Sequence, residues 1–302
     1  MLLNQDARKL EMTSRKKLFL VTGGLGFIGK NFVRRALEGG HYVTNIDVVN
    51  YAADRKANKE FQDFDHYRHL QQDIAALPYL SECDVVVNFA AESHVDNSIA
   101  DSRQFCHTNF LGTQRLLELV RAKAPLDRPR FVQISTDEVY GDIVDGAHKE
   151  SDILKPSNPY SATKAAADLL VLGWARTYNI KYNILRMTNN YGMHQYPEKL
   201  IPKSSFRLLR GRPALIHGNG TYRRSWLHVE DCIDAISLVI EKGAEDTVYN
   251  VNGEQEFQNI DVVRKIANFI GIPEETAITY VPDRVGQDIR YSLDASRIRE
   301  LG

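Results

Sequence analysis

The segment at residues 22–29, TGGLGFIG, limits what this chain can fold into more than any other feature. It follows the apolar run KLFLVT at residues 17–22 and precedes a helical pattern at residues 27–37. Its glycines recur every three residues, at Gly23, Gly26 and Gly29. The first permits a tight turn, the second lets the backbone approach a pyrophosphate, and the third packs the helix against the strand. A strand, this turn and a helix predict the first unit of a dinucleotide-binding fold.

The alternation of strands and helices continues beyond this unit. Further strands are predicted at residues 41–46, 84–89, 130–135 and 181–187, and helices near residues 103–123 and 157–178. This alternation predicts an α/β fold with a doubly wound parallel Rossmann sheet over residues 17–188. The pattern is less regular at residues 189–302, which are predicted to form mainly a smaller α/β substrate-binding lobe, with an interleaved boundary. Residues 1–16 are predicted to be a polar extension.

Composition and charge narrow the class of partner. Of the 302 residues, 43% are hydrophobic and 25% are charged, which is typical of a globular chain. The formal net charge of −1 gives no electrostatic footprint for nucleic acid or an anionic membrane. No stretch approaches the roughly 20 apolar residues of a membrane span. Cys83, Cys106 and Cys232 lack the spacing of a zinc site or a disulfide framework. We therefore expect a cytoplasmic protein without a metal, whose partner is a small molecule.

Residues beyond the glycine turn predict NAD as the cofactor. Asp47 lies about 20 residues after the glycines, at the end of the second strand, where a carboxylate accepts hydrogen bonds from the adenosine ribose. Such a carboxylate repels the 2′-phosphate of NADP, and residues 48–50 offer no arginine to neutralise one. The helix N-terminus is expected to face the phosphates with its unpaired N–H groups. Further candidate cofactor contacts are Phe27, Ile28, Asp73, Ile74, Ala90, Ala91 and Ser135.

Tyr160 and Lys164 are the candidate catalytic pair. They stand four residues apart near the start of a predicted helix, so both side chains project from one face. An ammonium group beside a phenol stabilises phenolate, and Lys164 is therefore expected to lower the pKa of Tyr160. Tyr160 would then take a hydroxyl proton as a hydride leaves the same carbon. Ser135 and Thr136 end a predicted strand just upstream and would bind the substrate oxygen and lie beside the cofactor.

These motifs resemble those of the extended short-chain dehydrogenase/reductase family, through TGGLGFIG, a serine or threonine after the fifth strand, and YSATK. Six longer stretches narrow the resemblance to the nucleotide-sugar 4,6-dehydratases, most closely those that act on dTDP-glucose. They are AAESHVD (90–96), STDEVYG (135–141), NPYSATKAAAD (158–168), NNYGMHQYPEKLIP (189–202), RSWLHVED (224–231) and DRVGQDIRY (283–291). The UDP-glucose 4,6-dehydratases share most of these stretches, so the reaction is better indicated than the base.

The resemblance implies a reaction in three stages with NAD. Tyr160, helped by Thr136 and Lys164, would remove the proton of sugar O4 while a hydride leaves C4. Glu138 would then remove the C5 proton as general base, and Asp137 would protonate the departing C6 hydroxyl as general acid. Return of the hydride to C6 would give a 4-keto-6-deoxy sugar, with NAD remaining tightly bound.

The resemblance also implies a site for a nucleotide-diphosphate sugar and a homodimer formed by the helices at residues 103–123 and 157–178. Candidate substrate contacts are Lys199, Arg224, Arg284 and Asn189 for the diphosphate, Ser93 for glucose, and Leu200, Pro202 and Tyr222 for the base. Arginine suits phosphate because its planar group offers a fork of donors. Gln287 and Asn97 stand where many bacterial members have histidine and arginine. The base preference therefore stays open.

Two other functions use the same motifs. A nucleotide-sugar 4-epimerase or decarboxylase would share Tyr160, Lys164 and the glycines, but it would not need the adjacent acid and base at Asp137 and Glu138. A non-catalytic NAD-binding protein would usually lack the tyrosine or the lysine. Both are present here, which favours an NAD-dependent hydro-lyase.

Overall fold

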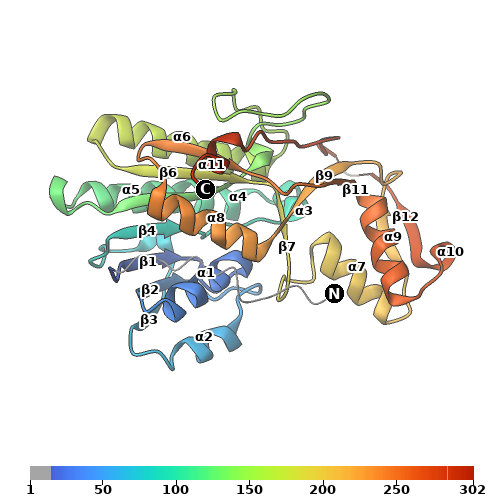
Figure 1. Cartoon of the computed structure of the whole chain (residues 1–302), viewed down its shortest axis with the longest axis horizontal. Coiled ribbons are helices and arrows are strands. Elements are labelled where there is room, and N and C mark those ends of the chain that lie inside the picture. Colours follow the sequence, from blue (N-terminus) through green and yellow to red (C-terminus); the bar gives the residue numbers. More distant parts are fainter. Residues whose placement is uncertain (1–14, 284) are drawn as a thin grey trace.

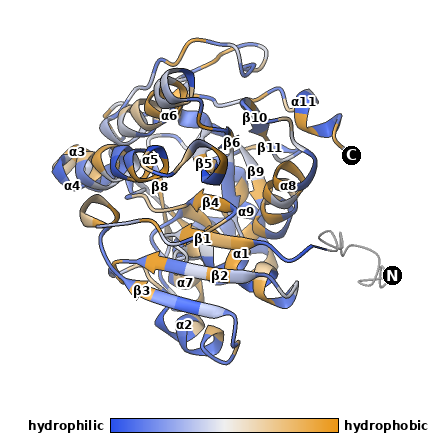
Figure 2. Cartoon of the chain, turned by 90° about the vertical axis from the view of Figure 1, so that its left-hand side faces the viewer, coloured by the Kyte–Doolittle hydropathy of each residue, from blue (hydrophilic) through white to orange (hydrophobic). Residues whose placement is uncertain are grey.

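A sheet of seven parallel strands forms the larger part of the molecule. The computed structural model describes residues 15–283 and 285–302, so most of the predicted polar extension and Arg284 lie outside the described residues. The spatial order of the strands is β10-β6-β5-β4-β1-β2-β3 (Figures 1 and 2). They are β1 (Leu18–Thr22), β2 (Tyr42–Asp47), β3 (Tyr67–Gln71), β4 (Val85–Asn88), β5 (Arg130–Thr136), β6 (Tyr182–Met187) and β10 (Thr247–Val251). The central strands β1 and β4 are short apolar runs because helices cover both of their faces.

Helices pack on the two faces of this sheet (Figure 2). One face carries α1 (Phe27–Glu38), α2 (Arg55–Phe61), α8 (Val229–Lys242) and α11 (Ser296–Arg299), and the other carries α5 (Thr113–Arg121) and α6 (Pro159–Tyr178). None of the helices in the described part of the chain is both long and apolar enough to cross a membrane. The predicted doubly wound parallel fold is confirmed, and the predicted strands and helices begin and end within about two residues of those observed.

The strand order reverses between β1 and β4, and the chain leaves these two strands toward opposite sides. In such sheets the carboxyl ends at the reversal form the ligand-binding crevice. At this point the backbone of Gly23 lies close to the backbone of Ala90, so that a Cβ atom on Gly23 would be 2.7 Å from Cα and N of Ala90. Gly23 also has φ +67°. Only glycine combines that conformation with that contact at little cost.

A smaller lobe is built on two short sheets. One contains β7 (Asn189–Tyr191), β9 (Arg223–His228) and β11 (Glu256–Gln258), and the other contains β8 (Ala214–His217) and β12 (Ile278–Val281). Its helices α7 (Leu200–Leu209), α9 (Asn259–Ile270) and α10 (Glu274–Ala277) lie beside these sheets in Figure 1. Between β9 and β11 the chain returns to the large sheet as α8 and β10. The two parts are therefore interleaved along the sequence.

The helix predicted near residues 103–123 has an irregular middle. It consists of α4 (Arg103–Phe105), a π-helical stretch η3 (Cys106–Gly112) and α5. From the π-helical stretch, the side chain of Asn109 accepts from the N–H of Glu92 at 2.9 Å and donates to its carbonyl at 3.1 Å. Asn109 also donates to Oγ1 of Thr163 at 2.9 Å. The π-helical stretch thus fixes the segment that follows β4, a role often found for such turns near functional sites.

Candidate active site

A cavity of about 480 Å³ opens at the carboxyl ends of the central strands, between the large sheet and the smaller lobe. The sequence-predicted residues that line it are Gly23, Gly26, Phe27, Ile28, Gly29, Asp47, Asp73, Ile74, Ala90, Ala91, Ser93, Ser135, Thr136, Asp137, Glu138, Tyr160, Lys164, Asn189, Lys199, Leu200 and Arg224. Pro202 and Tyr222 are not among the lining residues, and Arg284 lies outside the described residues. Across the described ranges, no three His, Cys, Asp or Glu side chains are grouped so that they could hold a metal ion.

The glycine turn forms a cradle with the shape and polarity that a pyrophosphate needs. Helix α1 begins after Gly26, which provides no side-chain cap, so the N–H groups of the first turn face the cavity with the positive end of the helix dipole. A Cβ atom on Gly29 would lie 2.3 Å from the carbonyl oxygen of Gly23, so this position accepts glycine alone. These residues fit a dinucleotide phosphate at this end of the cavity.

Asp47 ends β2 with both carboxylate oxygens already oriented. Its Oδ2 accepts from the N–H of Leu25 at 3.0 Å, and its Oδ1 accepts from the N–H of Val49 at 2.8 Å. Val49 has φ +58°, an unusual conformation for a β-branched residue, and this hydrogen bond helps to hold it. Each carboxylate oxygen has two acceptor positions, so Asp47 can still receive ribose hydroxyls.

Asp73 is also held in place before any ligand binds. It caps the short 3₁₀ helix η2 (Ile74–Ala76) by accepting from the N–H of Ala75 at 2.8 Å. Its other carboxylate oxygen lies 2.7 Å from Nε2 of His107, in the π-helical stretch. The His107 contact was not predicted from the sequence.

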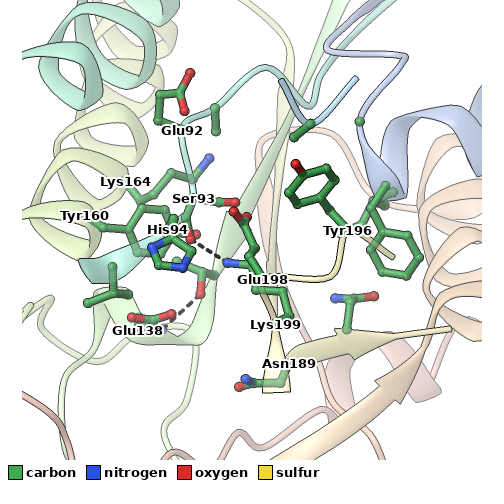
Figure 3. A pocket seen from close by; sticks show the side chains of 18 of the residues that line it. Glu92, Ser93, His94, Glu138, Tyr160, Lys164, Asn189, Tyr196, Glu198 and Lys199 are labelled. Carbon is green, nitrogen blue, oxygen red and sulfur yellow. Dashed lines mark hydrogen bonds between the residues drawn. The ribbon is translucent and has the colours of Figure 1, made fainter. Parts of the chain in front are cut away.

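The start of α6 positions the catalytic pair. Asn158 caps the helix by accepting from the N–H of Ser161 at 3.0 Å, and the Ser161 hydroxyl accepts from the N–H of Asn158 at 3.2 Å. Pro159 occupies the first helical position, which this capping arrangement favours. Tyr160 and Lys164 then project from the same face into the cavity, as Figure 3 shows.

The ammonium group of Lys164 is held by strand β5. Its Nζ donates to the carbonyl of Ile134 at 2.7 Å, and burial lowers the pKa of Lys164 to about 8. Burial also raises the pKa of Tyr160 above its usual value, and the nearby Glu138 and Asp137 raise it further. The expectation of a lowered pKa for Tyr160 is therefore wrong, because desolvation and two acidic neighbours raise this pKa.

Asp137 and Glu138 lie on η5 (Asp137–Val139), directly after β5, and both face the cavity. Burial and the nearby charge of Glu138 together raise the pKa of Asp137 to about 7, while Arg224 opposes the change. Burial also raises the pKa of Glu138, against Arg224, Lys199 and the amide of Asn158, which lies 3.4 Å from its Oε2. One carboxyl can hence be protonated near neutral pH while its neighbour is closer to stabilising cations and an amide donor.

The burial of Asp137 predicts how the free energy of unfolding depends on pH. Its pKa is about 7 when folded but near 3.8 when exposed, so its contribution to folding is lost as pH rises from about 4 through 7. Asp137→Asn removes an ionised buried carboxylate, and we expect it to raise the free energy of unfolding at pH 8 by roughly 2–4 kcal/mol relative to the wild type. The gain should vanish near pH 4.

Denaturant unfolding of both proteins between pH 4 and 9 measures this difference. Asp145→Asn, at an exposed loop position, should show no such pH-dependent gain and serves as the matched control. A constant difference across the whole pH range would mean that Asp137 does not titrate as the structure indicates.

The smaller lobe supplies the opposite wall of the cavity. Figure 3 shows Asn189, Tyr196, Glu198 and Lys199 across from Glu138, Tyr160 and Lys164. The Nζ atom of Lys199 donates to the carbonyl of Ser93 at 2.7 Å. The two walls are thus in direct contact beside the acid–base pair.

Arg224 is buried at the cavity wall. Its guanidinium donates to the carbonyls of Arg223 at 2.6 Å and Asp288 at 2.9 Å, and it lies 4.2 Å from the ring centroid of Tyr291. Tyr222 instead donates its hydroxyl to the carboxylate of Asp283. Backbone carbonyls hold the Arg224 cation without neutralising it, which leaves its charge available to an anionic ligand.

Several lining residues were not predicted. They include Asn158, which the cap pattern before a proline could have revealed, and Glu92, His94, Tyr196 and Glu198, which lie inside motifs without a distinctive local signal. Several buried polar atoms of lining residues, among them Oδ2 of Asp137, Oδ1 of Asn190 and Oε1 of Gln287, have no hydrogen-bond partner among the described residues. Such atoms are expected where a ligand supplies the partner.

Comparisons with known proteins agree with this geometry. The family model described as GDP-mannose 4,6 dehydratase matches residues 20–302. The low-salt glycan biosynthesis protein Agl12 of Haloferax volcanii is 43% identical over 94% of this chain and 92% of its own length. The dTDP-glucose 4,6-dehydratase of Streptomyces niveus is also 43% identical, over 94% of this chain and 86% of its own.

Solved structures extend the likeness to three dimensions. DesIV, a dTDP-glucose 4,6-dehydratase from Streptomyces venezuelae solved with NAD bound, has a TM-score of 0.89 at 40% identity and covers 94% of this chain and 91% of its own. A UDP-glucuronic acid 4-epimerase from Bacillus cereus has a TM-score of 0.88 at 25% identity, with coverages of 94% and 92%. The family match and the relatives above 40% identity confirm the resemblance found in the motifs. This chain belongs to the GDP-mannose 4,6 dehydratase family, within the extended short-chain dehydrogenases/reductases.

Proposed function

We propose that this protein is an NAD-dependent nucleotide-sugar 4,6-dehydratase, which converts dTDP-glucose or UDP-glucose into the corresponding 4-keto-6-deoxy sugar. The observation that carries the proposal is the adjacent pair of buried Asp137 and half-buried Glu138, which faces the same cavity as Tyr160 and Lys164. Oxidation of the sugar at C4 needs only Tyr160 and Lys164. Removal of water needs an acid and a base in addition.

NAD is the proposed cofactor because the glycine cradle, Asp47 and Asp73 fit a dinucleotide. The chemistry that NAD supplies when bound is the reversible acceptance of a hydride, taken from sugar C4 and returned to C6. Tyr160 is proposed to receive the O4 proton, with Thr136 as a further hydrogen-bonding group. Burial raises the pKa of Tyr160, and the positive charge of the oxidised nicotinamide ring would favour its phenolate form.

Elimination is assigned to the adjacent carboxyls. Asp137, with a pKa of about 7, is proposed to donate a proton to the C6 hydroxyl. Glu138 is proposed to remove the C5 proton, which the 4-ketone acidifies. Arg224 and Lys199 favour the ionised form of Glu138 and would hold the diphosphate as well. Ser93, Asn189 and Leu200 are proposed substrate contacts on the same cavity.

Gln287 is the proposed contact for the nucleotide base. Gln287 lines the cavity, and its Oε1 is buried without a hydrogen-bond partner among the described residues, so it is available to a base. The hydroxyl of Tyr222 donates to Asp283, which directly precedes the proposed diphosphate contact Arg284 in the sequence. Gln287 can act as donor and acceptor, which suits either thymine or uracil.

The test is incubation of the purified protein with dTDP-glucose and, separately, with UDP-glucose in deuterated water, followed by NMR of the products. We expect a 4-keto-6-deoxy sugar with deuterium at C5, from at least one substrate. A C4 epimer without solvent label would contradict the proposal and would favour the 4-epimerase, whose fold has the same arrangement.

We further propose a cytoplasmic homodimer. The cysteines Cys83, Cys106 and Cys232 are all free, as a reducing compartment requires. Large apolar side chains are exposed near the two helices named for the dimer contact, with Phe110 and Leu111 at the end of η3 and Leu169 on α6. A dimer burying these residues would remove them from water.

A further inference from the structure

Lys30 is a buried cation next to the glycine turn, and no step of the proposed reaction uses it. It follows Gly29 on α1, and only 5% of the residue is exposed. Its Nζ donates to Oδ2 of Asp54 at 2.7 Å and to the carbonyl of His194 at 3.1 Å. Lys30 therefore joins the first helix of the cofactor domain to a segment of the smaller lobe that lies 164 residues further along the chain.

The segment at residues 192–199 is held at two other points. The hydroxyl of Tyr51 donates to Oε2 of Glu198 at 3.1 Å, and the rings of Tyr51 and Tyr196 meet edge to face with centroids 5.4 Å apart. Lys199 reaches the carbonyl of Ser93, as described above. All three attachments cross from the smaller lobe to the cofactor domain.

The attachments lie at the edge of the cofactor end of the cavity. Gln195, Tyr196, Glu198 and Lys199 line the cavity from one side, and residues 46–53 contribute most of their side chains to it from the other. Tyr51 itself lies between two lining residues, Asn50 and Ala52, without lining the cavity. A dinucleotide held against Asp47 is thus enclosed between two walls that these bonds connect.

The Lys30 attachment has a local cost that indicates a fixed position. His194 has φ +65°, a left-handed conformation that is unfavourable for a non-glycine residue. A buried ammonium also requires partners, and Asp54 and the His194 carbonyl provide them. Because Asp54 is itself the N-cap of α2, the lysine is anchored to a rigid element on the cofactor side.

We infer that Lys30 is a positioning residue that fastens the segment 192–199 across the cofactor site and thereby slows the release of NAD. The inference rests on the proposed function only in that NAD is the ligand. Departure of the dinucleotide requires the two walls to separate, and separation breaks a charged hydrogen bond at Lys30 in addition to the Tyr51 contact. Lys30 itself is not among the residues that line the cavity.

The experiment measures how fast NAD leaves the holoenzyme. Protein purified with NAD is mixed with excess isotopically labelled NAD, and exchange is followed by rapid desalting and mass spectrometry. Lys30→Met should accelerate release by about 10-fold or more, because the variant lacks a charged hydrogen bond that connects the two walls of the cavity. Lys30→Arg keeps the charge and should restore most of the slow release. Arg34→Met, another change on α1, removes an exposed ion pair with Glu60 of α2 and should release NAD at the wild-type rate.

A second variant separates the role of Lys30 in closure from a role in folding. Tyr51→Phe removes only the hydroxyl that binds Glu198, and we expect release about three-fold faster. In the double variant the two effects should be coupled, since both residues hold one segment. Unchanged release in Lys30→Met overturns the inference, and if that variant does not fold, unchanged release in Tyr51→Phe does so. A wild-type protein that binds no NAD would instead contradict the proposed function.

Discussion

Glu138→Gln should lower formation of the 4-keto-6-deoxy sugar by about 100-fold to 10,000-fold, the range typical for loss of a positioned general base. The side chain is nearly unchanged in shape, and its amide can still meet Asn158, which lies 3.4 Å from Oε2. Tyr160, Lys164 and the glycine turn are untouched. The variant should therefore still oxidise the substrate at C4 and accumulate reduced cofactor, detectable by its absorbance.

The diagnostic readout is deuterium at C5. In deuterated water the wild type should incorporate solvent hydrogen there, whereas Glu138→Gln should not, although its cofactor becomes reduced. Glu245→Gln, at an exposed position outside the cavity, is the control and should behave as the wild type. Full C5 exchange by Glu138→Gln would remove Glu138 as the base. Loss of cofactor reduction would assign it to the oxidation step instead.

Contiguous motifs made the cofactor turn and the catalytic helix predictable from sequence. The glycines at 23, 26 and 29 act within one turn of chain, and Tyr160 and Lys164 lie on one face of a helix whatever surrounds it. Local geometry of this kind is determined by spacing alone. The same holds for the alternation of strands and helices, which predicted the parallel sheet.

Contacts between distant segments gave no such signal. The bond from Lys30 to His194 and the bond from Tyr51 to Glu198 join residues 164 and 147 positions apart, and neither pair has a local pattern. The prediction of a lowered pKa for Tyr160 was wrong for a related reason. Spacing located the lysine beside the tyrosine, but burial and the carboxyls of η5, which arrive from another part of the sheet, determine the electrostatic balance.

A second buried charge pair supports the catalytic helix from behind. Asp168 lies one turn after Lys164 on α6, and its Oδ2 accepts from Nε of Arg186 on β6 at 2.9 Å. The two side chains are 0% and 3% exposed. Arg186 also donates to the hydroxyl of Tyr140 at 2.7 Å. Asp168 counteracts the lowering of the Lys164 pKa that burial causes, so the pair affects both stability and the charge of the catalytic lysine.

Asp168→Asn should destabilise the protein by about 3–5 kcal/mol, because it leaves the buried guanidinium of Arg186 without its counter-charge. Thermal unfolding should show a melting temperature lower by roughly 10 °C, while Glu60→Gln, which breaks an exposed pair, should leave it near the wild-type value. Where the variant remains folded, the alkaline limb of its pH–activity profile should shift to lower pH. The reason is that Lys164 loses the neighbour that favours its charged form. A decrease of less than about 1 kcal/mol in the free energy of unfolding would mean that other groups balance the Arg186 charge. An unshifted alkaline limb would mean that Asp168 supports the fold without influencing Lys164.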